Sequence, residues 1–123
     1  MRALVIDDSR TVRAIIGKTL RELGMEVIEA ANGREGLDQL RQQPGVRLVL
    51  VDWNMPEMNG LEFITAARAD RAFDAVRIMM VTTETEQEQV MRALSAGANE
   101  YLMKPFTREI LVAKLGLLDV LEE

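Results

Sequence analysis

Five short apolar runs alternate along this chain with five segments of helical periodicity. No linker or low-complexity segment interrupts this order over the 123 residues. Strands that alternate with helices predict a parallel sheet covered on both faces, and right-handed crossovers make such a sheet doubly wound. The sequence therefore predicts one α/β domain with a doubly wound (βα)5 fold. Among doubly wound strand orders, which the pattern alone does not distinguish, we prefer the flavodoxin-like order 2-1-3-4-5 for the five parallel strands.

The apolar runs predict strands at residues 3–6, 25–30, 46–52, 76–81 and 101–103. The third run is typical of a buried strand, because β-branched residues and leucines continue up to Asp52 and turn residues follow at once. Capping residues predict helices after Ser9, Asn59 and Thr107, the last running to the C-terminus, with two more at residues 33–43 and 86–96. Inward-facing stripes are predicted in the first helix at Val12, Ile15, Ile16, Leu20 and Leu23, and in the fourth at Val90 and Leu94.

Composition narrows the chemistry, because the chain has neither histidine nor cysteine. A zinc site is nearly excluded, and a Ser-His-Asp or Cys-His mechanism is excluded outright. The lack of cysteine gives no support for an oxidising compartment, and the first residues resemble no signal peptide. With no apolar run long enough for a bilayer, we expect a cytoplasmic protein. The net charge of −5 argues against nucleic acid or anionic membrane as the main partner.

Residues able to do chemistry follow four of the predicted strands. Since parallel strands end at one edge of a sheet, that edge should collect Asp7 and Asp8, Asp52, Thr82 and Lys104. Aspartate and threonine often only cap the next helix, but three acids and a lysine exceed what capping needs. Crowded carboxylates are tolerated where a cation binds, and an all-oxygen ligand set favours Mg²⁺.

These residues lead to the hypothesis that Asp52 is a nucleophile that accepts a phosphoryl group. A carboxylate that attacks phosphorus approaches an anion, so the negative charge has to be neutralised. Mg²⁺ on Asp8 and Asp52 would do part of this and the Lys104 ammonium the rest, while the Thr82 hydroxyl could donate to a phosphoryl oxygen. The acyl phosphate product is labile, so the modified state would be temporary.

Four motifs then carry a resemblance to a known family. In chain order they are Val5-Ile6-Asp7-Asp8-Ser9, Val51-Asp52-Trp53-Asn54-Met55-Pro56, Val81-Thr82-Thr83-Glu84 and Tyr101-Leu102-Met103-Lys104-Pro105-Phe106. With these motifs the sequence resembles the receiver domains of bacterial two-component response regulators, most closely the single-domain CheY-like type. The resemblance extends from end to end, which implies that residues 1–123 form one receiver domain.

The resemblance implies specific roles at the acidic edge. Asp52 would be the phospho-acceptor, and Lys104 would contact the phosphoryl group. Mg²⁺ would bind the carboxylates of Asp8 and Asp52 and the backbone carbonyl of Asn54, while Asp7 would hold a coordinating water.

The resemblance also implies how the signal is read and how long it lasts. Thr82 would be the switch hydroxyl and Tyr101 the switch aromatic, and the peptide bond before Pro105 is expected to be cis. Asn54 and Glu84 would border the approach of the hydrolysing water and so tune dephosphorylation.

The implied partners are two proteins. Because the sequence has no histidine, the phosphoryl donor would be another molecule, a histidine kinase or a histidine phosphotransfer protein, docking at the basic first helix. The downstream target would bind the surface formed by the fourth helix, fifth strand and fifth helix. This protein itself would be a monomer or a phosphorylation-linked dimer. A solvated basic face and a fully buried last helix remain the alternatives for these two surfaces.

Two other functions stay open from the sequence alone. One is a Mg²⁺-dependent phosphohydrolase with Asp52 as nucleophile, although Asn54 cannot serve as the general acid that this class usually has two residues on. The other is a constitutive interaction module with an inactive site. In either case we expect the crowded acids to destabilise the metal-free fold, so that Asp7→Asn or Asp52→Asn would stabilise it.

Overall fold

The computed structural model describes residues 1–83 and 87–121. Its strands are β1 (Arg2–Ile6), β2 (Glu26–Ala30), β3 (Val46–Asp52), β4 (Arg77–Thr82) and β5 (Glu100–Met103). Its helices are α1 (Arg10–Glu22), α2 (Gly33–Gln42), α3 (Gly60–Arg68), α4 (Gln87–Ala96) and α5 (Arg108–Leu117), with a short 3₁₀ helix, η1 (Arg71–Phe73). The predicted alternation of strands and helices is confirmed.

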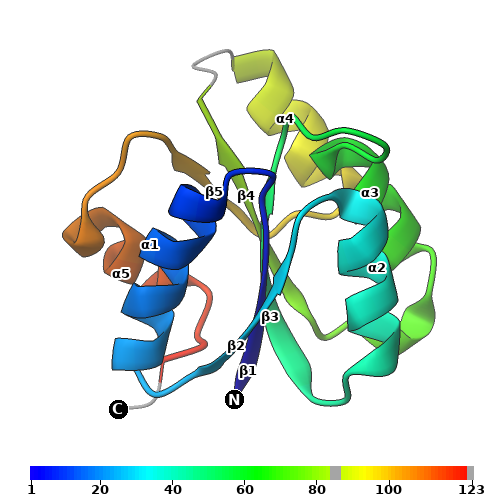
Figure 1. Cartoon of the computed structure of the whole chain (residues 1–123). Helices are drawn as coiled ribbons and strands as arrows, with labels where there is room; N and C mark the ends of the chain where they lie inside the picture. Colours follow the sequence, from blue (N-terminus) through cyan, green and yellow to red (C-terminus); the bar gives the residue numbers. More distant parts are fainter. Residues whose placement is uncertain (84–86, 122–123) are drawn as a thin grey trace.

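All strand pairs are parallel, and the sheet order is β2-β1-β3-β4-β5, as predicted. Figure 1 shows α1 and α5 on one face of the sheet and α2, α3 and α4 on the other. The chain leaves β1 for one side of the sheet and β3 for the other, so a crevice forms between their carboxyl ends. This crevice is where the acidic residues lie.

The core consists of one buried cluster on each face of the sheet. Successive β3 residues alternate between them, with Val49 and Val51 in the cluster under α2, α3 and α4, and Leu48 and Leu50 in the cluster under α1 and α5. All four side chains are fully buried. Burial on both faces explains why the strand sequences are continuously apolar instead of alternating.

The predicted helix caps are confirmed for α1, α3 and α5. The side chains of Ser9, Asn59 and Thr107 each accept a hydrogen bond from a backbone N–H in the first turn. The prediction that the last helix runs to the C-terminus is wrong, since α5 ends at Leu117. Asp119 has a φ of 58°, a left-handed conformation that cannot continue a helix, and Val120 then packs into the core.

Two residues predicted to face the core are exposed. Ile15 in α1 is 54% exposed and Leu94 in α4 is 40% exposed. The buried stripes are centred on Ile16 in α1 and Ala93 in α4. Neighbouring residues on a helix point about 100° apart around its axis, and Ile15 directly precedes Ile16 while Leu94 directly follows Ala93. Both side chains therefore lie at the border of their stripes and extend the surface instead of the core.

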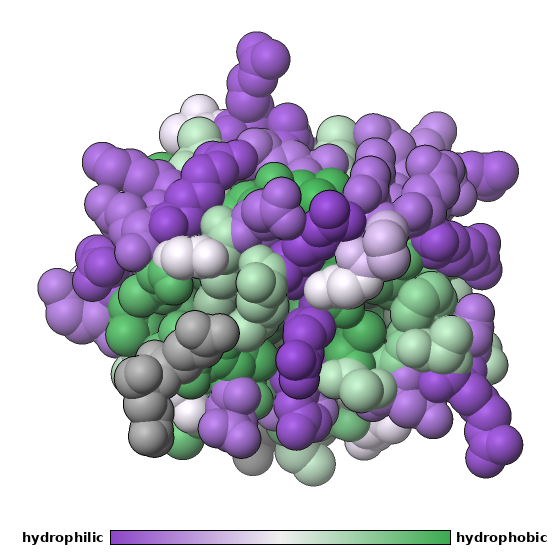
Figure 2. All heavy atoms as spheres, turned by 90° about the horizontal axis from the view of Figure 1, so that it is seen from below, coloured by the Kyte–Doolittle hydropathy of each residue, from purple (hydrophilic) through white to green (hydrophobic). Residues whose placement is uncertain are grey.

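The two edges of the sheet differ in what they expose. Figure 2 shows the edge where the strands begin, with hydrophilic side chains around a rim and hydrophobic ones between them. Among the helices of the described residues, none has the length and apolarity to cross a membrane. The charged residues that the sequence analysis singled out gather at the other edge, where the strands end.

Candidate functional site at the carboxyl ends of the strands

Asp7 follows β1 directly and is held at every polar atom. Its backbone N–H donates to Ala30 O at 3.1 Å, and its Oδ1 accepts from Ser9 N at 2.8 Å. Its other carboxylate oxygen faces Lys104, and its carbonyl oxygen accepts from Arg13. With a residue exposure of 1%, Asp7 is a fixed and buried carboxylate.

Asp52 is the last residue of β3 and is placed by the register of the sheet. Ile6 pairs with Val51 and Asp52 pairs with Val81, so Asp52 lies beside the first residue after β1. The following turn is held by Trp53, whose N–H donates to Val81 O and whose carbonyl accepts from Gly60 N, both at 3.0 Å. Only 7% of Asp52 is exposed.

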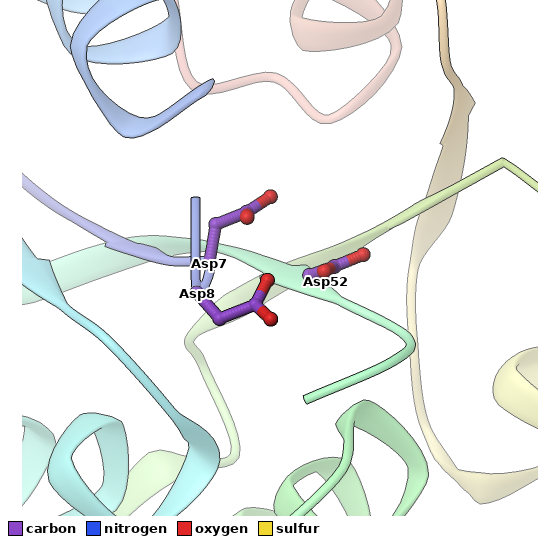
Figure 3. A group of neighbouring side chains, drawn as sticks. All are labelled: Asp7, Asp8 and Asp52. Carbon is purple, nitrogen blue, oxygen red and sulfur yellow. The ribbon is translucent and has the colours of Figure 1, made fainter. Parts of the chain in front are cut away.

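Asp7, Asp8 and Asp52 bring one carboxylate oxygen each within 4.8 Å of one another. Figure 3 shows the three side chains, two from the end of β1 and one from the end of β3, directed to the same side. Ligand oxygens 2.0–2.1 Å from one Mg²⁺ are at most about 4.2 Å apart. The three acids are thus close to the spacing of a magnesium site, and a small movement of their side chains suffices to reach it.

Lys104 closes the site from β5. Its Nζ lies 2.9 Å from Asp7 Oδ2 and 3.4 Å from Asp52 Oδ1. Burial opposes the charge of Lys104, but the hydrogen bond to Asp7 and the charge of Asp52 outweigh it, so the pKa of Lys104 is raised. The ammonium therefore stays protonated and contributes a fixed positive charge between the two carboxylates.

Asp52 carries the main electrostatic strain. Burial and, after it, the negative charge of Asp7 raise the pKa of Asp52, while Lys104 offsets only part of this, so that the pKa rises from 3.8 to about 6. A carboxylate that is poorly solvated and repelled by its neighbours gains from a cation or from conversion to a less charged form. Both outcomes suit a site that binds a divalent ion and modifies this side chain.

The remaining predicted residues differ in how close they lie to this cluster. Thr82 ends β4 fully buried, and its carbonyl accepts from Lys104 N at 2.8 Å, so the two residues are backbone neighbours. Asn54 lies in the exposed turn two residues after Asp52. The bond before Pro105 is cis, as predicted. Glu84 lies outside the described residues, so its role stays a prediction.

Tyr101 lies away from the edge, in the middle of the sheet's end strand. It pairs with Met80, two residues before Thr82, and its ring packs beside the cluster under α2, α3 and α4. Lys114 of α5 places its Nζ 3.9 Å from the ring centroid and 3.1 Å from Glu100 Oε1. The ring is thus half-buried beneath a cation that sequence reasoning did not find.

Gly60→Ala tests how strictly the turn after Asp52 is built. A Cβ on Gly60 would lie 2.4 Å from Asp52 O and 3.0 Å from Trp53 Cα, so the backbone that carries Asp52 has to move. We expect a loss of about 1–3 kcal/mol in the free energy of unfolding, measured with denaturant. Gly116→Ala in α5 meets nothing within 4 Å and is the control, expected to be neutral or stabilising.

Sequence reasoning missed a groove, the position of Lys114 over the Tyr101 ring, and the partly buried Arg13. The groove has a volume of about 530 Å³ and lies between α1 and the turn after β5. It is lined by Val12, Ile15, Thr83, Lys104, Pro105 and Phe106. The sequence signal for this groove was Ile15. It belongs to the apolar stripe of the first helix, but the core does not bury it and it lines the groove instead.

The comparisons with known proteins agree with this geometry. The family model described as the response regulator receiver domain matches residues 3–116. The chain is 47% identical over 116 residues to a chemotaxis protein CheY homolog of Campylobacter jejuni, which covers 94% of this chain and 89% of that protein. It is also 47% identical to chemotaxis protein CheY1 of Helicobacter pylori, with 94% of each covered.

Solved structures give the same result. Chemotaxis protein CheY4 of Vibrio cholerae superposes with a TM-score of 0.89 at 36% identity, covering 95% of this chain and 97% of that one. A CheY-like receiver domain protein of Methanospirillum hungatei superposes with a TM-score of 0.86 at 32% identity, covering 96% and 93%.

Proposed function

This chain belongs to the response regulator receiver family, and we propose that it takes a phosphoryl group onto Asp52 from a histidine kinase or a histidine phosphotransfer protein. The observation that carries the proposal is the arrangement around Asp52. Its buried carboxylate has Lys104 Nζ at 3.4 Å and carboxylate oxygens of Asp7 and Asp8 within 4.8 Å. In this reading, residues 1–123 form one receiver domain that acts in the cytoplasm.

The reaction needs one bond to form and one to break. An Asp52 carboxylate oxygen forms a bond to phosphorus, and the bond from phosphorus to the donor's imidazole nitrogen breaks with its electron pair going to that nitrogen. Lys104 stays charged and offsets the negative charge that gathers on the phosphoryl oxygens. The Thr82 hydroxyl is the proposed donor to a phosphoryl oxygen once the group is attached.

The oxygen donors at this edge fit a magnesium ion. We assign the carboxylates of Asp8 and Asp52 and the backbone carbonyl of Asn54 as its ligands, with Asp7 holding a coordinating water. The ion, when bound, neutralises charge on the transferred group. Asn54 and Glu84 remain the proposed residues that tune hydrolysis of the acyl phosphate.

The proposed donor surface is the groove beside the site. It is mostly apolar, it opens next to Lys104, and Ile15 lines it while being 54% exposed. A histidine-bearing helix that buries its apolar residues there would bring the phosphoryl group to the edge where Asp52 lies. The exposed basic residues of α1 would contact the acidic rim of such a helix, whereas Arg13 is occupied within the domain.

The proposed output surface consists of α4, β5 and α5. Its helices expose large apolar side chains, at Met91 and Leu94 on α4 and at Ile110 and Leu117 on α5. Phosphorylation would shift Thr82 and Tyr101 within a pre-existing two-state equilibrium and so change this surface. The Campylobacter and Helicobacter relatives are named as chemotaxis proteins, which supports chemotaxis as the pathway that we propose.

Phosphoryl uptake is the direct test of this function. We expect incubation with acetyl phosphate and Mg²⁺ to add the mass of one phosphoryl group to the wild-type protein, measured by intact mass spectrometry. Asp52→Asn, which keeps the shape of the side chain and removes the nucleophile, should add none. Asp38→Asn on the exposed face of α2 changes the charge equally and should be labelled like wild type.

A turnover assay with small phosphomonoesters separates a receiver from a phosphohydrolase. A receiver modifies itself and releases phosphate slowly from its own acyl phosphate, so it should not turn over small phosphomonoesters. Multiple turnovers of such an ester that depend on Asp52 would favour the phosphohydrolase. Equal labelling of wild type and Asp52→Asn would contradict Asp52 as the acceptor.

A further inference from the structure

Arg13 is a partly buried cation beside the acidic site. It lies in the first turns of α1, yet its side chain is only 14% exposed. Its Nη1 donates to the carbonyl oxygen of Asp7, and its Nε donates to Glu29 Oε1 at 3.1 Å. One guanidinium therefore joins the turn after β1 to strand β2.

The Asp7 carbonyl matters because it belongs to the peptide group that leads into Asp8. A peptide group is planar, so a bond that fixes its oxygen also fixes the direction in which the next Cα leaves. Within the described part of the chain, no hydrogen bond or ion pair reaches the Asp8 carboxylate, which is exposed. The position of Asp8 relative to Asp52 is therefore set through its backbone.

Glu29 explains how Arg13 keeps its orientation. It pairs with Val5 in the sheet, so its backbone is rigid, and its second carboxylate oxygen lies 3.6 Å from Arg21 Nη2. A guanidinium donates in fixed directions and can serve two acceptors at once, whereas an ammonium acts as a point charge. The rigid strand thus orients the arginine, and the arginine orients the turn.

We propose that Arg13 is a positioning residue of the cation site: by holding the Asp7 carbonyl, it sets where the Asp8 carboxylate lies relative to Asp52. This inference rests on the proposed function, because it assumes that Mg²⁺ binds Asp8 and Asp52. The proposed effect comes from the direction in which the guanidinium donates and not from its charge. Arg13→Lys, which keeps the charge, distinguishes the two causes.

Magnesium affinity is the measurement that tests it. Trp53 is the single tryptophan of the chain, is 8% exposed and directly follows Asp52, so its fluorescence can report a titration with MgCl₂. We expect Arg13→Gln to raise the Kd for Mg²⁺ about tenfold or more, as loss of a group that orients metal ligands does. Arg13→Lys keeps the positive charge but lacks the fixed donor directions of a guanidinium, so it should lose most of this affinity too.

Two controls make the result specific. Arg10→Gln removes the same charge from the exposed start of α1 and should change the Kd less than about twofold, since charges exposed to water are well screened. Glu29→Ala removes the acceptor that orients Arg13 and should give a smaller loss in the same direction. This second variant provides the test if Arg13→Gln does not fold, which its metal-free melting curve shows.

A double-mutant cycle tests the route through Asp8. If Arg13 acts by positioning Asp8, the loss caused by Arg13→Gln should shrink to less than about twofold when Asp8 is already asparagine. The same loss in both backgrounds, or wild-type affinity in Arg13→Lys, would overturn the inference while leaving the proposed function intact. A wild-type protein that neither binds Mg²⁺ nor takes up a phosphoryl group would instead contradict both.

Discussion

Asp52→Asn is expected to stabilise the metal-free protein at pH 7 by on the order of 3 kcal/mol. The reason is that burial and the charge of Asp7 raise the pKa of Asp52 from 3.8 to about 6 in the folded state, and each pKa unit corresponds to about 1.4 kcal/mol. Asparagine has nearly the same shape and carries no charge, so it removes this penalty. Denaturant unfolding of both proteins in the presence of a chelator measures the difference.

The pH dependence follows from the same shift. Because the folded-state pKa lies above the unfolded value, the folded protein holds this proton more tightly, and the penalty is complete above about pH 6 and absent below about pH 3.8. The advantage of Asp52→Asn over wild type should therefore disappear as the pH falls through this window. Asp38→Asn is the charge-matched control and should show no such convergence. Equal stability of wild type and Asp52→Asn at pH 7 would contradict a strained Asp52.

Added Mg²⁺ should narrow the stability difference between the two proteins. Mg²⁺ that binds only the folded state stabilises it by mass action, and Asp52→Asn lacks one of the proposed ligands. Wild type should therefore gain more from added Mg²⁺ than the variant does. Since protons compete for Asp52, the apparent affinity of wild type for Mg²⁺ should fall below about pH 6.

The contacts of Asp7 and Asp52 predict different effects of the two asparagine substitutions on stability, although the sequence alone predicted that either would stabilise the metal-free fold. Asp7 lies 2.9 Å from the Lys104 ammonium and accepts from Ser9 N, so its charge is compensated by close partners. Removing that charge would leave the Lys104 ammonium paired with Asp52 alone, at 3.4 Å. We therefore expect Asp7→Asn to stabilise the metal-free fold less than Asp52→Asn does, because it relieves the repulsion on Asp52 but also removes the closer partner of Lys104.

Arg68→Ala is expected to destabilise the protein by on the order of 3 kcal/mol, because one guanidinium at the end of α3 satisfies four acceptors. It donates to the carbonyls of Phe73, Val76 and Gly97 and to Asn99 Oδ1, at distances between 2.7 and 2.9 Å. These acceptors belong to the turn before β4 and to the turn between α4 and β5. Alanine would remove this donor from all four, although Asn99 Oδ1 still accepts from Ile78 N at 2.8 Å. Denaturant unfolding would reveal the loss as a lower free energy of unfolding.

Two substitutions make the Arg68 prediction specific. Arg68→Lys keeps the charge but cannot reach acceptors on several sides, so most of the loss should remain. Arg92→Ala removes an exposed arginine from α4 and should change the free energy of unfolding by less than about 0.5 kcal/mol. A small loss in Arg68→Ala would mean that water replaces the guanidinium and that the two turns are held by other contacts.

The sequence was sufficient wherever one strand end decides the position of a residue. Asp7, Asp52 and Lys104 could be placed at one edge because each follows a strand of a parallel sheet, and their contacts in the structure follow from that register. These positions are consequences of backbone topology. The strand order agreed with the flavodoxin-like order preferred from the sequence, but right-handed crossovers also allow other doubly wound orders, so the apolar pattern did not decide it.

Contacts between side chains of different elements could not be read in the same way. Nothing in the sequence indicates that Arg13 turns inward to the Asp7 carbonyl, or that Lys114 lies over the ring of Tyr101. Helical periodicity also could not decide Ile15, which lies at the border of its stripe, where a rotation of one residue changes burial into exposure. The most informative surprises therefore lie on helix faces beside the site.

Locating the phosphoryl group within the chain tests the central claim most directly. After phosphorylation with acetyl phosphate, borohydride reduces an aspartyl phosphate to homoserine, and tandem mass spectrometry of the peptides identifies the position. We predict homoserine at position 52 alone, in a yield that chelation of Mg²⁺ abolishes. Homoserine at position 7 or 8, or a yield at position 52 that is the same with and without Mg²⁺, would contradict a cation-assisted acceptor at Asp52.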